Sequence, residues 1–324
     1  MAAKKLLALV AVCVLVLFIF WLAVTPPGPT IPSPVVPSPA EPNGDGMAPL
    51  YVTVFGIGRA DATVIRHRDY AVMIDTGENQ HGAYLVNRLT EMGVKRLDYL
   101  IITHFDNDHV GGAHVIINYI NVLNVVVPNY SRESRHVERF ENAMQNANIL
   151  PYVLTAPLHL TLGDASLMLD PSGLPYMHFP RVHEDDADDE IDEDEMDVMF
   201  TGDDFSIVTA VSHGMVHFLF TGDALNHRLG EVKQNEALMA LNYTYLHIPR
   251  HGRHTRRSVS LIHALRPMYA VITGFHPDEW DVYYPARPAD VRIINALAAV
   301  GASVFFTMSR GVAFVSDGLA LRVL

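Results

Sequence analysis

The chain has 324 residues, 49% of them hydrophobic, which is enough for one large folded domain or two modest ones. Its single cysteine, Cys13, excludes a disulfide framework and a thiolate metal site, so any metal site must use histidine and carboxylate ligands. The formal net charge is −13, but eleven of the 36 acidic residues lie within residues 184–197, and the other 25 nearly balance the 23 basic residues.

The N-terminal residues predict a membrane anchor. Residues 6–24 form an uncharged apolar run long enough to cross a bilayer as a helix. A cleaved signal peptide is the alternative, but its apolar core is usually shorter and ends in small residues, whereas this run ends just before two prolines. Lys4 and Lys5 favour a cytoplasmic N-terminus, residues 1–5. We therefore expect a single-pass protein of the cell membrane with its folded part outside the cytoplasm.

Two further segments differ in composition from a folded domain. Residues 25–47 are rich in proline and predict an extended, semi-rigid linker to a domain spanning residues 48–324. The acidic segment 184–197 predicts a solvated, mobile loop, because like charges this dense repel each other and cannot enter a core. A cation-gathering or autoinhibitory loop is the alternative.

Strand and helix patterns alternate along the domain. Short β-branched and aromatic runs predict strands, and apolar spacing near 3.6 residues predicts helices. A β-rich half with helices, followed by a second such half, indicates an α+β fold, a four-layer αββα sandwich with two sheets face to face and helices outside. The predicted strands are 50–55, 62–67, 70–74, 97–102, 122–127, 166–169, 205–211, 217–220, 244–248, 268–272, 303–306 and 312–315, and the predicted helices are 83–92, 132–148, 229–241, 258–265 and 288–300.

Metal-competent side chains follow three of the predicted strands. Coordinating residues need rigid platforms, which strand ends provide, and neighbouring glycines let backbone and ligand approach closely. The three groups are His104, Asp106, Asp108 and His109 after residues 97–102, Asp223 after residues 217–220, and His251 after residues 244–248.

The motifs around these residues resemble the metallo-β-lactamase superfamily. Within it they are most similar to the soluble hydrolase domain of ComEC-type competence proteins, which handle DNA during uptake. Residues 103–112 match the pattern T-H-x-D-x-D-H-x-G-G. Residues 54–62 resemble V-G-Q-G-D-A, residues 73–77 resemble L-I-D-T-G, residues 219–224 resemble L-x-T-G-D-A, and residues 249–255 resemble H-H-G-S-x-T.

The resemblance implies two divalent metal ions bridged by hydroxide. It assigns His104 and Asp106 to one metal ion and Asp108 and His109 to the other. Asp223 is implied to bridge the two ions and His251 to complete the second site. The mixture of carboxylates and imidazoles makes manganese credible beside zinc.

Two other positions are assigned from the same resemblance. Asp75 is expected to orient a ligand histidine or a loop, with a structural turn role as the alternative. A further ligand is expected in the middle of the chain. His159 and His178 lack the expected context there, which leaves Asp203 or Asp204 as substitutes.

The basic run at residues 250–257 is expected at the rim of the metal site. There Arg250 and Arg253 would bind phosphate oxygens, and His254 would protonate a leaving group. A solvated basic patch is the alternative. Together with Asp108 and Asp223, His254 is predicted to be catalytic.

These features predict a membrane-anchored, metal-dependent hydrolase. A phosphodiesterase or nuclease acting on DNA or another phosphodiester fits the metal ligands and the basic run best. An ester, lactone or β-lactam hydrolase is the alternative within the enzymes, because one fold hosts many substrates. The alternative outside the enzymes is a non-catalytic module that binds metal or nucleic acid.

Overall fold

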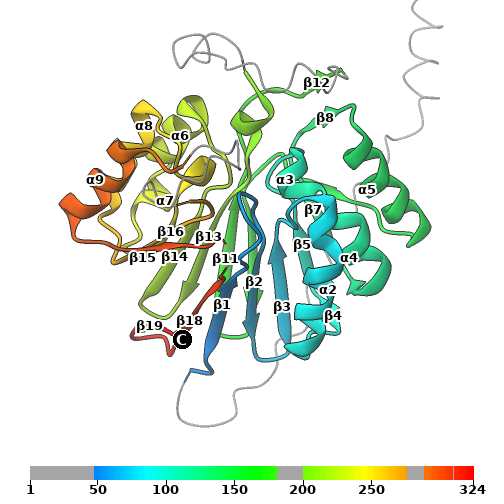
Figure 1. Cartoon of the computed structure of the whole chain (residues 1–324), viewed down its shortest axis with the longest axis horizontal. Coiled ribbons are helices and arrows are strands. Elements are labelled where there is room, and N and C mark those ends of the chain that lie inside the picture. Colours follow the sequence, from blue (N-terminus) through cyan, green and yellow to red (C-terminus); the bar gives the residue numbers. More distant parts are fainter. Residues whose placement is uncertain (1–46, 181–199, 276–287, 309) are drawn as a thin grey trace, which may run out of the picture. The chain divides into compact units, whose positions relative to one another are not determined.

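The computed structural model describes residues 47–180, 200–275, 288–308 and 310–324, all within one compact unit, Ser33–Leu324 (Figure 1). The predicted anchor at residues 6–24, nearly all of the linker and the acidic segment 184–197 lie outside the described residues. Within the described ranges, no helix combines the length and the apolar character needed to cross a membrane.

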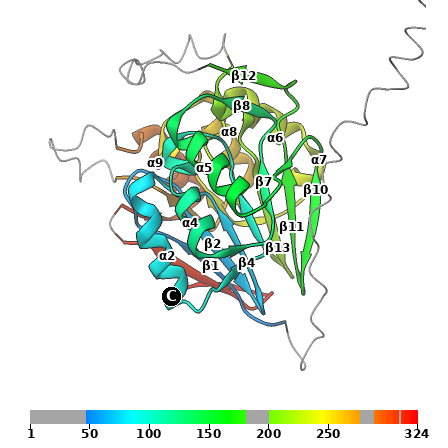
Figure 2. The same cartoon turned by 90° about the vertical axis from the view of Figure 1, so that its right-hand side faces the viewer.

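Two sheets lie face to face at the centre of the domain (Figures 1 and 2). The first has the strand order β19-β18-β1-β2-β3-β5-β7-β9 and the second β10-β11-β13-β14-β15-β16-β17. The strands of the first sheet are β1 (Leu50–Val54), β2 (Thr63–His67), β3 (Tyr70–Ile74), β5 (Tyr99–Ile101), β7 (Val125–Val127), β9 (Tyr152–Val153), β18 (Val312–Ser316) and β19 (Leu321–Val323). Those of the second are β10 (Leu158–Leu162), β11 (Ala165–Asp170), β13 (Val208–His213), β14 (Val216–Phe220), β15 (Tyr243–His247), β16 (Tyr269–Ile272) and β17 (Ser303–Phe306). Two short ladders pair β4 (Arg96–Leu97) with β6 (Asn121–Val122) and β8 (Tyr130–Arg132) with β12 (Met177–Phe179).

Helices cover the outer face of each sheet, which gives the predicted four layers (Figure 1). On the side of the first sheet lie α2 (Gly82–Glu91), α3 (Asn107–Val110), α4 (Ala113–Tyr119) and α5 (Arg135–Asn146). On the side of the second lie α6 (Asn226–Gln234), α7 (Glu236–Met239), α8 (Arg256–Leu265) and α9 (Val291–Val300). The 3-10 helices are η1 (Asn79–His81), η3 (Gly202–Phe205) and η4 (Pro249–Gly252).

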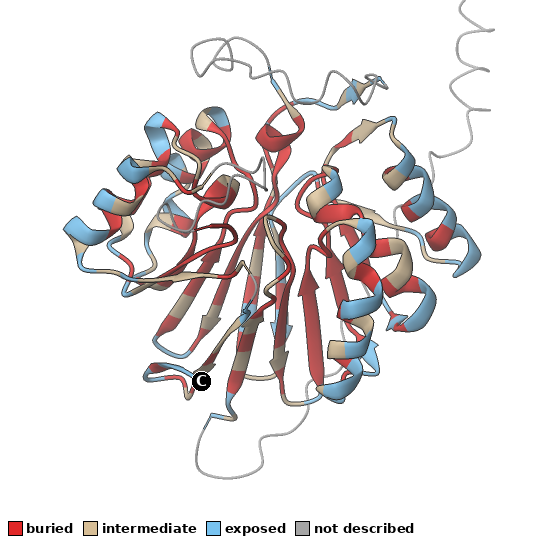
Figure 3. Cartoon of the chain, viewed as in Figure 1, coloured by how far each residue is buried: buried red, intermediate tan, exposed pale blue. Residues whose placement is uncertain are grey.

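Three apolar clusters separate the four layers of helices and sheets. The alternation of side chains along each strand explains how one sheet contributes to two of these clusters. Along β3, Val72 and Ile74 face the cluster between the sheets, whereas Ala71 and Met73 face the cluster under the first set of helices. A strand buried on both faces reads as a continuous apolar run, and β3 is buried at every position (Figure 3). The α+β sandwich predicted from the sequence is confirmed.

Strand direction decides where the site lies. Both sheets change from antiparallel to parallel pairing: β3, β5 and β7 are parallel in the first sheet, and β14, β15 and β16 in the second. In parallel strands the carboxyl ends meet at one edge, so residues that follow these strands gather there.

The structure corrects several predicted boundaries. The predicted strand 205–211 starts only at Val208, because Phe205 ends the 3-10 helix η3. The predicted helix 229–241 is two helices, because the Asn235 side chain accepts from Ala237 N and starts α7. Strands β10 and β19 were missed, since both are short runs at sheet edges.

Candidate metal centre

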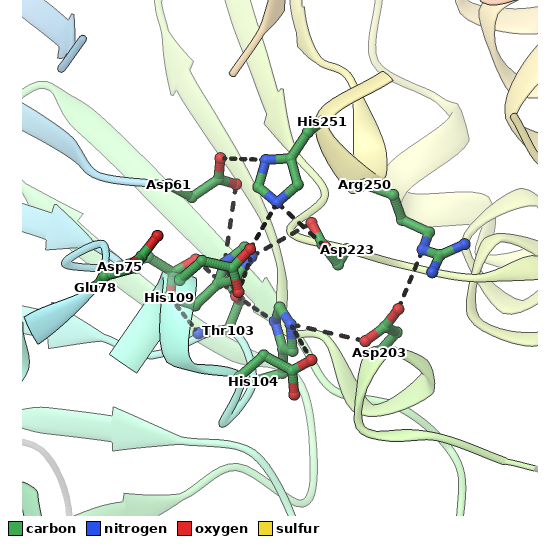
Figure 4. A network of polar contacts seen from close by, with 12 residues as sticks. Asp61, Asp75, Glu78, Thr103, His104, His109, Asp203, Asp223, Arg250 and His251 are labelled. Carbon is green, nitrogen blue, oxygen red and sulfur yellow. Dashed lines mark hydrogen bonds and ion pairs between the residues drawn. The ribbon is translucent and has the colours of Figure 1, made fainter. Parts of the chain in front are cut away.

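The carboxyl ends of the parallel strands bring the predicted ligands together (Figure 4). His104 and His109 follow β5, Asp223 follows β14, and His251 follows β15. Nitrogen and oxygen atoms of His104, His109 and Asp223 lie within 4.8 Å of one another, as do those of Asp108, His109 and His251. Three segments far apart in the sequence thus supply one cluster.

Asp223 lies among the predicted histidine and aspartate ligands. His251 Nε2 lies 3.1 Å from Asp108 Oδ2 and 3.5 Å from Asp223 Oδ2. His109 Nε2 lies 3.4 Å from Asp223 Oδ1 and 3.9 Å from Asp108 Oδ1. The two oxygens of Asp223 therefore face His109 and His251, and its ligand atom also lies within 4.8 Å of that of His104, so Asp223 stands between the two halves of the cluster.

The other half of the cluster contains Asp203, which the sequence could not separate from Asp204. Asp203 Oδ1 lies 3.8 Å from His104 Nε2, and Asp106 Oδ2 lies 4.0 Å from the same atom. Asp204 instead accepts a hydrogen bond from Thr201 N within η3. Of these two candidates for the mid-chain ligand, Asp203 is therefore the one that lies beside His104. Asp106 also forms an ion pair with Arg132.

Asp75 contacts His109, one of the histidines predicted to bind metal. Its carboxylate accepts from Thr103 N at 2.8 Å and Thr103 Oγ1 at 2.6 Å, and it lies 2.9 Å from His109 Nδ1. This contact leaves Nε2 of His109 facing the cluster. A carboxylate on the far nitrogen fixes the tautomer and orientation of a metal-binding histidine.

Asp61 is a buried carboxylate of the site that the sequence analysis did not single out. Its oxygens lie 3.1 Å from His247 Nε2 and 3.5 Å from His251 Nδ1. Thr273 Oγ1 also lies 3.0 Å from His251 Nδ1. The signal was present in the sequence, because Asp61 is the acidic residue of the segment 54–62.

The turn that carries His251 is strained. Arg250, His251 and Gly252 have φ values of 54°, 52° and 84°. The left-handed region costs roughly 1–2 kcal/mol for a residue with a Cβ, and such strain clusters at functional sites. This turn aims His251 into the cluster while Arg250 Nε lies 3.1 Å from Asp203 Oδ2.

Buried polar atoms test whether these residues fit metal ions. Within the described part of the chain, Nε2 of His104, Nε2 of His109 and Oδ1 of Asp223 are buried without a hydrogen-bond partner. Leaving such an atom unsatisfied costs about 1–3 kcal/mol, and more for a charged group. All three atoms point into the cluster, so bound cations would satisfy each of them. The residues fit divalent metal ions.

The pKa shifts of the clustered side chains indicate that this cluster favours positive charge. Burial would raise the pKa of Asp223, but His251 and His109 hold it well below its ordinary value. Burial works against protonation of His251, yet Asp223 and Asp108 raise its pKa to about 10. Burial and the neighbouring His109 lower the pKa of His104, so its imidazole is a neutral ligand.

The basic run lies beside the cluster. Burial lowers the pKa of Arg253, and so do the like charges of Arg250 and Arg59, whereas Asp203 and Asp223 act in the opposite direction. Hydrogen bonds from Arg292 lower the pKa of Asp290, at the start of α9, and His254 adds a smaller effect in the same direction. The role of His254 as an acid therefore stays a prediction.

Comparisons with known proteins agree with this fold and cluster. Residues 56–280 match the family described as the metallo-beta-lactamase superfamily. The chain is 34% identical over 95 residues to ComE operon protein 3 of Bacillus subtilis (strain 168), a match covering 24% of this chain and 12% of that protein. The chain thus spans only a small part of this curated relative.

Among solved structures, the metallo-beta-lactamase fold protein YhfI from Bacillus subtilis is 12% identical, with a TM-score of 0.49 and coverage of 83% of this chain and 100% of that chain. Igni18, a metallo hydrolase from the archaeon Ignicoccus hospitalis, is 14% identical, with a TM-score of 0.45 and coverage of 82% and 99%. Because the family match spans most of the chain and the cluster fits divalent cations, the chain belongs to the metallo-beta-lactamase superfamily and is a metal-dependent hydrolase.

Proposed function

We propose that this hydrolase is a phosphodiesterase acting on nucleic acid. The observation that carries the proposal is the group of arginines beside the metal cluster, Arg59, Arg250 and Arg253. Guanidinium groups gathered near one another repel, and a phosphodiester placed among them relieves that repulsion with paired hydrogen bonds. The resemblance of the motifs to DNA-uptake proteins favours nucleic acid among phosphodiesters.

The ligand set favours two divalent cations, zinc or manganese. With Asp203 the cluster has more carboxylates than imidazoles, which suits harder cations than a three-histidine site does. Bound there, such cations supply a hydroxide near neutral pH and take up negative charge on the phosphate. His104 and Asp106, joined by Asp203, would hold one cation. Asp108, His109 and His251 would hold the other, and Asp223 would contact both.

The protein's own groups position the substrate around those cations. Arg250 is fixed by Asp203 and offers its remaining donors to phosphate oxygens. Arg253 is half-buried and lies close enough to Asp223 for that carboxylate to raise its pKa. It would therefore bind the phosphate from the same side as Arg250. His254, the next residue, would donate a proton to the departing oxygen.

A nuclease assay tests the proposal. The full chain should cleave DNA when zinc or manganese is added, and the double variant Asp108→Ala, His109→Ala should not. His159→Gln, an exposed histidine on β10, is the matched control and should retain activity. Equal cleavage by the parent and the double variant would refute the proposal. Hydrolysis of p-nitrophenyl acetate or nitrocefin, but not of bis-p-nitrophenyl phosphate, would favour an ester or β-lactam hydrolase instead.

The arginine group has its own test. Arg253→Met should raise KM for DNA and weaken the dependence of KM on salt, because one phosphate contact is lost. Arg322→Met, an exposed arginine on β19, should leave both unchanged. An unchanged KM in Arg253→Met would count against phosphate binding at this rim.

We also propose that residues 6–24 anchor the enzyme in the cell membrane with residues 48–324 outside the cytoplasm. The support is the uncharged apolar run and the two lysines that precede it. In fractionated cells the full chain should pellet with membranes and resist extraction by carbonate, and added protease should digest the domain in intact spheroplasts. Recovery of the full chain in the soluble fraction would refute the anchor.

A further inference from the structure

A second cluster of ligand-type side chains lies at the other end of the sandwich from the metal centre. Asp61 of the metal centre precedes β2, and His67 ends that strand. Asp203 precedes β13, and His213 ends it. At roughly 3.3 Å per residue, each pair is separated by well over 10 Å. The third member, Asp164, lies in the turn between β10 and β11.

The three side chains converge. Ligand atoms of His67, His213 and Asp164 lie within 4.8 Å of one another. His67 Nε2 is 2.5 Å from Asp164 Oδ1, and the rings of His67 and His213 have centroids 5.1 Å apart. The two histidine side chains are fully buried, whereas Asp164 is partly exposed.

The outer nitrogens of both rings are already engaged. Nδ1 of His67 faces the Pro49 carbonyl at 3.3 Å, and Nδ1 of His213 lies 2.8 Å from Ser316 Oγ. With a proton on Nδ1, each Nε2 carries a lone pair that can bind a cation, as in metal-binding histidines. Without a cation, Nε2 of His67 instead donates to Asp164, so metal binding would displace that proton.

A buried ring nitrogen without a hydrogen-bond partner indicates that a bound group is missing from this cluster. Within the described ranges, Nε2 of His213 is buried without a hydrogen-bond partner, although the Ala48 backbone lies near the ring. Gly163 has a φ of 66°, and a Cβ there would lie 2.9 Å from Arg68 Cδ and 3.3 Å from His67 Nε2. Glycine at this position thus leaves room for Arg68 and His67 beside Asp164.

We propose that His67, His213 and Asp164 bind one zinc-like divalent cation, separate from the metal centre of the hydrolase. Two imidazoles and a carboxylate are a common ligand set for zinc. Bonds of about 2.0–2.1 Å place tetrahedral ligands roughly 3.3 Å apart, so His67 Nε2 and Asp164 Oδ1, which lie 2.5 Å apart, would have to separate. Asp164 lies on a partly exposed turn, where it also accepts from Ala48 N at 3.2 Å. The ion would join β2 of the first sheet to the second sheet.

Arg68 is the neighbouring group that opposes a cation here. Its Nε lies 2.8 Å from Asp164 Oδ1 and competes for the same oxygen. Removing this competitor should therefore increase the affinity of the cluster for zinc. Arg68→Asn removes the positive charge, and asparagine tolerates the φ of 51° at this position. Zinc affinity should then rise several-fold, a result that misfolding could not produce.

Metal content of the purified full chain, measured by mass spectrometry after dialysis against zinc, tests the site. Asp164→Asn and His213→Gln should each contain one zinc fewer per chain than the parent. His217→Gln is the matched control, since His217 lies on the adjacent strand β14 and is bonded to Ser212 Oγ. This variant should keep the parent's zinc content.

Equal zinc in the parent and in correctly folded Asp164→Asn would overturn the proposal, and so would unchanged zinc affinity in Arg68→Asn. If His213→Gln fails to fold, Asp164→Asn decides alone, because its side chain is partly exposed and asparagine still accepts from Arg68. The result is independent of the proposed phosphodiesterase activity, since the readout is bound metal and none of these residues belongs to the hydrolase centre.

Discussion

Asp203 lies beside His104, where the motifs leave one expected ligand missing. Burial raises its pKa to about 6, although Arg250 acts in the opposite direction. A carboxylate held in this way is stabilised in its ionised form by a cation nearby. Asp203 is therefore the residue on which filling of the first metal position should depend.

Replacement of Asp203 tests this role against a neighbour in the same turn. Asp203→Asn should reduce bound metal at the hydrolase centre from two ions to one. Asp204→Asn should not, because its side chain accepts from Thr201 N and asparagine retains that oxygen. Mass spectrometry of the two variants under identical metal loading gives the comparison. Full metal content in Asp203→Asn would show that Asp106 suffices without it.

The sequence predicted most of the cluster but not its complete membership. The motif after β5 and the residues after β14 and β15 were recognisable because each follows a buried strand. Asp203 and Asp204 were indistinguishable, since both lie in one 3-10 turn and only the turn's orientation separates them. Asp61 was passed over because it precedes its strand and contacts histidines from distant segments.

We expect Asp75 to affect metal binding through its contact with His109. Asp75→Asn keeps the volume and tolerates the φ of 55° but weakens the contact with His109 Nδ1. Loss of such a partner typically lowers metal affinity 10–100-fold, so we expect a fall of about that size. Competition with a chromophoric chelator measures it, and circular dichroism serves as the control for folding. An affinity within a factor of about two of the parent would leave Asp75 only a turn role.

At the scale of elements, helix α6 holds the segment that carries Asp203. Its Arg228 is fully buried. The guanidinium donates to Ser206 O at 2.9 Å and to Asp170 Oδ2 at 2.8 Å. Ser206 N in turn donates to Asp203 O. One buried cation thus connects α6, the end of β11 and the turn at the metal centre.

Arg228→Met should destabilise the fold strongly, because Asp170 would keep a buried charge without its partner. Removing one member of a buried ion pair costs about 3–5 kcal/mol. Lys233→Met on the same helix is the matched control, since Lys233 is exposed and should change the unfolding free energy by at most about 0.5 kcal/mol. Urea unfolding of both variants makes the measurement. A similar small effect of both substitutions would contradict this role for Arg228.

The elements were more predictable than their ends. Long apolar runs such as β3 and β14 were located within a residue or two, because burial on both faces makes them continuous in sequence. The boundary of η3 and the division between α6 and α7 depend on the side chains of Asp204, which accepts from Thr201 N, and Asn235, which caps α7, and a periodicity argument does not contain these contacts. The missed edge strands β10 and β19 each pair with the adjacent strand of a hairpin, and both contain exposed positions that interrupt an apolar run.

At the scale of the whole molecule, both proposed metal sites join parts of the chain that are far apart in sequence. The hydrolase centre takes His109 from the first sheet and Asp223 and His251 from the second. The cluster at the opposite end takes His67 from the first sheet and Asp164 from the second. Neither set of ligands exists in the unfolded chain, so metal binding should stabilise the folded state.

This coupling predicts how stability depends on free zinc. Each filled site should add about 1.4 kcal/mol to the unfolding free energy for every tenfold rise in free zinc above its Kd. Urea unfolding in a series of zinc buffers measures the slope. The double variant Asp108→Ala, His109→Ala should lose the part of this slope that comes from the hydrolase centre. Asp164→Asn should lose the part that comes from the cluster of His67, His213 and Asp164.

Because the two sites lie at opposite ends of the strands, the two losses should add. A slope that disappears completely in the Asp108→Ala, His109→Ala variant would assign all of the zinc dependence to the hydrolase centre. A slope unchanged in that variant would show that zinc binding at the hydrolase centre does not stabilise the fold. A parent protein whose unfolding free energy is the same at every zinc concentration would contradict stabilisation by metal at both ends of the sandwich.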